Sequence, residues 1–115
     1  MTLRMFAFVA ILIALPAAAQ EMDHGGHAVP DNPAAQALTA ANDKMMTDMT
    51  VALTGNPDRD FILMMIPHHQ GAIEMAKIEL QYGTDPEILR LAETIIAAQE
   101  AEIAGMKAWL AAHPE

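Results

Sequence analysis

The sequence predicts an all-α protein, a small antiparallel three-helix bundle. A capping residue followed by proline occurs three times, at Asn32-Pro33, Asn56-Pro57 and Asp85-Pro86, and such a pair is typical of a helix start. After each pair, apolar residues recur at intervals of three and four, which is the period of a helix. The 115 residues leave room for one domain, and no stretch reads as a strand.

The first 19 residues have the pattern of a secretory signal peptide. Arg4 precedes an apolar run over residues 5–15, and residues 17–19 form a small-residue cleavage site. That run is shorter than the roughly 20 residues that a membrane-spanning helix needs. We expect residues 1–19 to be removed and the protein to be periplasmic, without membrane contact after cleavage. An uncleaved anchor is the alternative. Residues 20–32 contain Gly25-Gly26 and Pro30 and show no periodicity, which predicts a flexible tail.

The bundle domain is expected over residues 33–113, with helices over 33–53, 57–82 and 86–112. Gly55 and Gly83 follow the first two helices and Pro114 follows the third. Connections of two to four residues make neighbouring helices antiparallel. A domain of under ~80 ordered residues is marginal, and a homodimer is one way to gain buried area. The expected inward stripes are Leu38, Ala41, Asn42, Met45, Met49, Ala52 and Leu53, then Phe61, Met65, His68, His69, Ala72, Met75 and Ala76, then Ile88, Ala92, Ile95, Gln99, Ile103, Met106 and Leu110.

Composition argues against several functions. The formal charge is -9, with Lys+Arg 6 against Asp+Glu 15, and nucleic acids and anionic membranes are held mainly by basic side chains. The absence of cysteine excludes disulfides, thiolate zinc sites, Cys nucleophiles and blue-copper centres. The sequence contains no Ser/His/Asp ordering, phosphate loop or pair of catalytic acids, so we expect no enzyme.

Methionine and histidine are the residues of this chain most suited to bind a ligand. After the leader the chain has eight methionines against seven leucines, although methionine specifies core packing poorly. His68 and His69 lie in the middle of the second helix, and Met64 and Met65 precede them by three or four positions, so thioethers and imidazoles share one surface. Met75, about two turns further on, belongs to the edge of this site or to a second one.

The ligand types favour copper. Thioethers are soft, uncharged ligands that select Cu(I), and imidazole suits both Cu(I) and Cu(II). We therefore expect a copper ion, chiefly Cu(I), with zinc held by the histidines alone as the weaker alternative. His24 and His27, in the tail, offer a capture site on flexible backbone, or belong to a linker that happens to contain histidine.

Three further residues affect the second and third helices. Pro67 lacks the N–H that would bond the carbonyl of Leu63, which predicts a kink or a fresh helix start before the histidines. Gln99 can orient an inward imidazole, or can bond Asn42 instead. His113 is expected to satisfy the end of the third helix rather than to bind metal.

Residues 34–112 resemble the bacterial domain of unknown function 305 family. The resemblance rests on these segments: Asp60-Phe61, Met64-Met65-Ile66-Pro67-His68-His69-Gln70, Ala72-Ile73-Glu74-Met75-Ala76, Gln99, Glu102-Ile103, Met106 and Trp109-Leu110. It implies a ferritin-like helical packing and export. Some members are periplasmic copper-binding proteins with Met and His ligands. The resemblance thus implies copper ligands at Met64, Met65, His68, His69 and Met75, and also at Met45, Met49 and Met106.

Two functions follow from these expectations. The first is periplasmic copper sequestration or chaperoning, with a metal-donor or metal-acceptor protein as partner. The alternative is an exported helical interaction module that is independent of metal, whose methionine-rich groove binds a partner helix. They differ in whether copper stabilises the protein.

Overall fold

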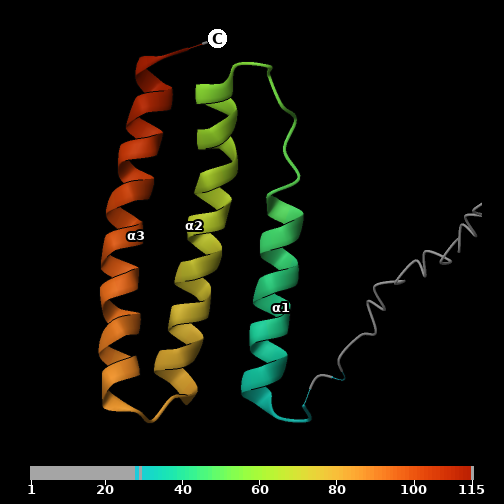
Figure 1. The fold of residues 1–115 in the computed structure, drawn as a ribbon, viewed down its shortest axis with the longest axis vertical. Helices are drawn as coiled ribbons and strands as arrows, with labels where there is room; N and C mark the ends of the chain where they lie inside the picture. The colour runs from blue at the N-terminus through green and yellow to red at the C-terminus, as the bar shows by residue number, and fades with distance from the viewer. Residues whose placement is uncertain (1–27, 29, 115) are drawn as a thin grey trace, which may run out of the picture.

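The computed structural model describes residue 28 and residues 30–114, and every regular element in that part is an α-helix. Helix α1 spans Pro33–Asp48, α2 spans Pro57–Tyr82 and α3 spans Pro86–Ala112. Figure 1 shows α2 between α1 and α3, with neighbouring helices antiparallel. The predicted all-α, antiparallel three-helix fold is confirmed.

Each helix begins with the same local arrangement, an extended capping residue followed by proline. Asn32 Oδ1 accepts from the N–H of Ala35 at 2.8 Å, and Asn56 Oδ1 accepts from two N–H groups of α2 at 3.0 and 3.2 Å. Asp85 Oδ1 does the same for α3 at 2.8 and 3.3 Å. These bonds satisfy N–H groups that have no partner within the helix, which explains why all three starts could be predicted.

The end of α1 was predicted wrongly. The helix ends at Asp48 and not at Leu53, so the first connection covers residues 49–56 and is longer than expected. The carboxylate of Asp60 in α2 accepts from the N–H of Thr54 at 2.7 Å, its hydroxyl at 2.8 Å and the N–H of Gly55 at 2.9 Å. Gly55 has a φ of +90°, which favours glycine. A tertiary anchor therefore stops the apolar pattern from continuing as a helix.

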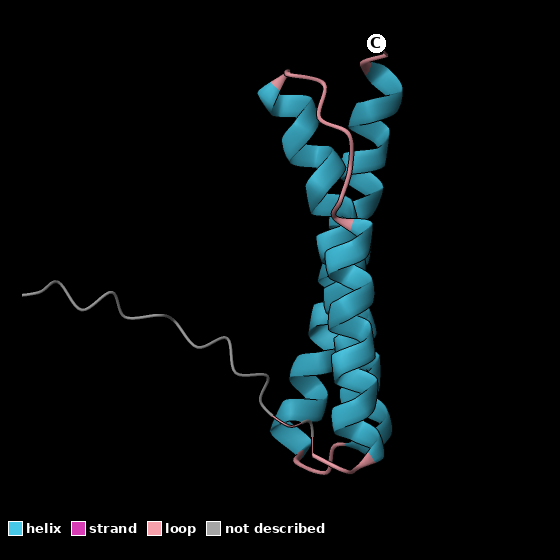
Figure 2. Cartoon of the chain, turned by 90° about the vertical axis from the view of Figure 1, so that its right-hand side faces the viewer, coloured by secondary structure: helices cyan, strands magenta, loops and turns pink. Residues whose placement is uncertain are grey.

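The three helices lie in a single layer. Helix α2 packs against both neighbours, whereas α1 and α3 do not contact each other. Viewed from the side, the helices overlap into one column along their middle (Figure 2). Within the described residues, the buried apolar side chains are Pro67, Ile73, Ala76 and Ala92. The core is therefore confined to the seams of α2, and both broad faces of the layer are open.

The seam between α1 and α2 depends on a close approach at Gly71. A Cβ built on Gly71 would lie 2.8 Å from Met45 Cβ, closer than Cβ atoms normally come. Met45 therefore occupies the space that a side chain on residue 71 would need.

Helix α2 runs through Pro67 as one helix, and Pro67 is buried. The expected fresh start at this proline does not occur.

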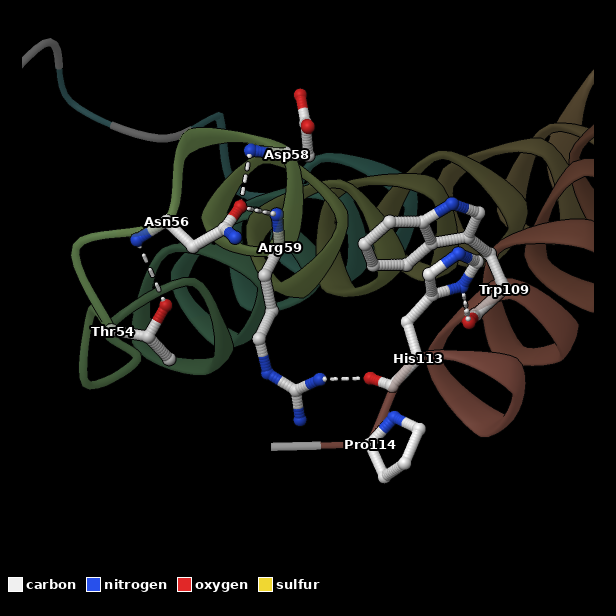
Figure 3. Close-up of a pocket in the computed structure, with 7 residues that line it drawn as sticks. All are labelled: Thr54, Asn56, Asp58, Arg59, Trp109, His113 and Pro114. Atoms are coloured by element: carbon white, nitrogen blue, oxygen red, sulfur yellow. Dashed lines mark hydrogen bonds between the residues drawn. The ribbon is translucent and has the colours of Figure 1, made fainter.

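The start of α2 is tied to the end of α3 (Figure 3). Arg59 Nη1 donates to the carbonyl of His113 at 2.9 Å, and His113 stacks on Trp109 with ring centroids 4.1 Å apart. His113 Nδ1 bonds the carbonyl of Trp109 at 2.8 Å, so the expectation that His113 satisfies the end of this helix is confirmed. These residues line a hollow of about 690 Å³. No helix in the described part is long and apolar enough to span a membrane.

Candidate metal site

A groove between α2 and α3 brings together part of the predicted methionine and histidine cluster. Phe61, Met65 and His69 follow one another at four-residue intervals, so they lie on one side of α2. From α3, Glu102 and Met106 face them, and the groove has a volume of about 410 Å³. It therefore contains two thioethers, one imidazole and one carboxylate.

His69 is held by a partner that the sequence analysis did not assign. Its Nε2 lies 2.6 Å from Oε2 of Glu102, and the side chain of His69 is 14% exposed whereas that of Glu102 is 60% exposed. A carboxylate accepts hydrogen bonds and does not donate them, so Nε2 donates, and in the neutral imidazole the lone pair is on Nδ1. That Nδ1 is buried and has no hydrogen-bond partner. Glu102 thus sets the tautomer and leaves the lone pair of the buried Nδ1 without a partner.

Gln99 supplies a second acceptor of this kind. Its Oε1 is buried without a hydrogen-bond partner, and Gln99 lies one turn before Glu102 on α3. The predicted role of Gln99 in orienting an imidazole is wrong for His69, which bonds Glu102 instead. The predicted alternative, a bond to Asn42, does not form either, because α1 and α3 are not in contact. Buried acceptors without donors are uncommon and costly, so a cation or a water molecule would stabilise both.

His68 departs from the expected inward position. It is exposed, and its ring centroid lies 6.0 Å from that of His69 with the planes inclined at 62°. Consecutive residues of a helix point about 100° apart, and α3 covers only the side on which His69 lies. The sequence pattern placed both imidazoles on the apolar stripe of α2, but only one of them reaches the seam with α3.

The predicted methionines fall into separate environments. Met65 and Met106 line the groove with His69. Met75 lines a second groove of about 300 Å³, further along α2 and α3. Met45 packs over Gly71 on the α1 side, and Met49 is the C-cap of α1.

Met64 is partly buried on α2, and the structure brings it into none of the grooves described above. His24 and His27 lie outside the described residues. Within residues 28 and 30–114, no group of three or more His, Asp or Glu side chains could hold a metal ion.

The position of Glu102 near the seam and the close approach at Gly71 could both have been predicted from the sequence. Glu102 lies four residues before Met106 and three after Gln99, both predicted to face inward, so the same helical spacing predicts that Glu102 lies near the seam. Gly71 lies in the interior of a helix, where glycine is unfavourable and usually has a packing reason.

Comparison with known families identifies the chain. The model of the domain of unknown function family DUF305 matches residues 9–110. A comparison with curated proteins found no match. The matched range contains all three helices except the last two residues of α3, together with the groove that holds Met65, His69, Glu102 and Met106. The protein therefore belongs to the DUF305 family.

Proposed function

We propose that this protein binds copper, chiefly as Cu(I), in the groove between α2 and α3, and that it acts in the periplasm to sequester the ion or to pass it to an acceptor protein. One observation carries the proposal. His69 donates through Nε2 to Glu102, and its buried Nδ1 has no partner in a seam that also contains Met65 and Met106.

The donor set fits a soft ion. Two thioethers and one neutral imidazole carry no charge, and such ligands prefer Cu(I) to calcium, magnesium or manganese. A carboxylate that accepts from the other nitrogen of a metal-binding histidine is the usual arrangement around such ligands, since it fixes the tautomer and makes the ligand nitrogen more basic. Glu102 supplies that carboxylate.

Titration of the purified protein with Cu(I), against a competing chelator, tests the proposal. We expect His69→Ala to weaken binding strongly, because it removes the imidazole of the groove. Met46→Leu is the control, since Met46 is 58% exposed on α1 and lies away from the groove. Equal affinities for His69→Ala and wild type would overturn the assigned site.

A metal-independent interaction module is the second candidate, and the open apolar side chains of the layer favour it. Phe61 is 62% exposed, and Leu91 is also largely open to solvent. The two functions differ in thermal unfolding. A ligand at a hundred times its dissociation constant stabilises the folded state by about 2.7 kcal/mol, so copper raises the melting temperature only if the first proposal holds.

A further inference from the structure

We infer that a second copy of this chain covers the apolar face of the α2–α3 pair, forming a twofold-symmetric homodimer. We define this open apolar face by six residues. On α2 they are Phe61, Met65, His68 and Met75, and on α3 they are Ile88 and Leu91. Helical spacing places the first four on one side of α2, and all but His68 line the two grooves between these helices.

The two faces of the layer differ in polarity. On the opposite side of α2 lie Gln70, Glu74, Lys77 and Gln81, all exposed, with Glu74 and Lys77 paired at 3.9 Å. The open apolar face, in contrast, leaves Phe61 62%, Leu91 52% and Ile88 45% exposed. In soluble proteins, contiguous exposed apolar patches of this kind mark interaction sites. The polarity therefore identifies one face of the layer as the face that is buried.

A single layer of helices cannot form an ordinary core. Stable domains bury the apolar face of each layer against a second layer. Here α1 and α3 lie on either side of α2 without meeting, and two of the few buried apolar residues of the described part, Ala76 and Ala92, line the groove between α2 and α3. Within the stripe of α2 that was predicted to face a core, Ala76 is buried, whereas Phe61 and His68 are exposed to solvent in the single chain.

The size of the face matches a stable dimer. Helices of 26 and 27 residues are each about 40 Å long at 1.5 Å per residue, and packed helices lie roughly 10 Å apart. The α2–α3 face therefore covers on the order of 800 Å² per copy, or about 1,600 Å² for two copies, which is the area of a standard specific interface. A second copy supplies an identical apolar face, and twofold dimers are the commonest assemblies.

The charges of the chain do not oppose this pairing. Glu79 and Glu102 are the charged residues that line the two grooves, and Asp58 lines an adjoining hollow with Phe61. Glu102 is already paired with His69. Apolar contact between two copies therefore buries few carboxylates, and the cost of desolvating unpaired charge stays small.

If the proposed copper binding holds, the dimer adds a donor, His68, from each copy to the metal site. His68 lies near the middle of α2 and is exposed on this face, and residues near a twofold axis meet their own counterparts. With the twofold axis over the middle of α2, the two His68 imidazoles approach each other and become available, with Met65, to a soft ion. Copper then strengthens the dimer, and His68→Ala removes that strengthening while the dimer without copper persists.

Sedimentation of the purified protein, with metal removed by a chelator, tests the dimer separately from copper. We expect a dimeric mass for wild type and for Leu53→Glu, and a helical monomer for Phe61→Glu. Leu53 is a matched control because it is 63% exposed, against 62% for Phe61, but lies in the first connection. A monomeric wild type at every concentration, or a dimer unchanged by Phe61→Glu, would overturn the inference.

Cysteine cross-linking keeps the inference testable if Phe61→Glu fails to fold. The chain has no cysteine, so a single introduced thiol can form only disulfides between chains. We expect His68→Cys to give a covalent dimer rapidly on oxidation. Gln70→Cys, also exposed but on the polar side of α2, should give little. Equal cross-linking of the two variants would count against this face as the interface.

Discussion

His69 Nε2 of α2 lies 2.6 Å from Glu102 Oε2 of α3, a contact between residues that are 33 positions apart in the chain. This contact decides which nitrogen of the imidazole keeps its lone pair, because the carboxylate can only accept. The same contact joins the two helices at the groove that contains Met65 and Met106.

Glu102→Gln should weaken Cu(I) binding without abolishing it. An amide can accept less strongly than a carboxylate and can also donate, so the tautomer of His69 is no longer imposed. Loss of such an orienting partner typically lowers metal affinity by roughly 10–100-fold. Competition titration measures the change, with Glu100→Gln as the control, because Glu100 is an exposed carboxylate on the same helix. Equal losses in the two variants would point to a general charge effect.

The double substitution Met65→Leu and Met106→Leu should remove Cu(I) binding while the fold persists. Leucine has nearly the volume of methionine, so each exchange should cost less than about 1.5 kcal/mol of stability. The loss of affinity should exceed that of Glu102→Gln, because two ligand sulfurs are removed rather than an orienting group. Met45→Leu, which changes the α1 seam, is the control. Full Cu(I) binding by the double variant would exclude these sulfurs as ligands.

Gly71→Ala and Gly105→Ala should shift stability in opposite directions. Both glycines lie inside helices, where alanine is favoured by about 1 kcal/mol. A Cβ on Gly105 meets nothing within 4 Å, so we expect that full gain, whereas a Cβ on Gly71 would lie 2.8 Å from Met45 Cβ.

Overpacking of this kind costs about 1–3 kcal/mol, so Gly71→Ala should be destabilising. Urea denaturation measures both changes. Adding Met45→Ala to Gly71→Ala should recover part of the loss, because it removes Sδ and Cγ of Met45, which a Cβ on Gly71 approaches even more closely than it approaches Met45 Cβ. Stabilisation by Gly71→Ala would mean that α1 does not approach α2 this closely.

Asp60 should make stability depend on pH in the acid range. Hydrogen bonds from Thr54, first from its backbone N–H and then from its hydroxyl, together with the N–H of Gly55 lower the pKa of Asp60 below its ordinary 3.8, although burial raises it. Because the pKa is lower in the folded state, the carboxylate stabilises the fold above the pKa of the unfolded chain. That stabilisation is lost as the pH falls through the folded-state pKa.

We therefore expect Asp60→Asn to lower the urea midpoint at neutral pH and to reduce its fall below about pH 4. Asp58→Asn is the control, since Asp58 occupies the same first turn of α2. If Asp60→Asn left the acid dependence as steep as in wild type, the anchor on the first connection would not be the source of that dependence.

The starts of the helices were determined by the sequence alone, because a capping side chain acts on N–H groups two or three residues away. Asn32, Asn56 and Asp85 needed no tertiary contact to act as caps. The apolar stripe of α2 was likewise readable, since helical spacing fixes which residues share a side. The end of α1 at Asp48 was not, because it depends on Asp60 anchoring Thr54 and Gly55 from another element.

Only the tertiary structure decided what that stripe of α2 contacts. Periodicity shows that a helix has an apolar side but contains no information on which neighbour covers it, because that choice depends on contacts between residues far apart in the chain. The arrangement in one layer turned His69 toward Glu102 and left His68 in solvent. The same arrangement separated Met75 and Met45 from the groove of Met65 and Met106.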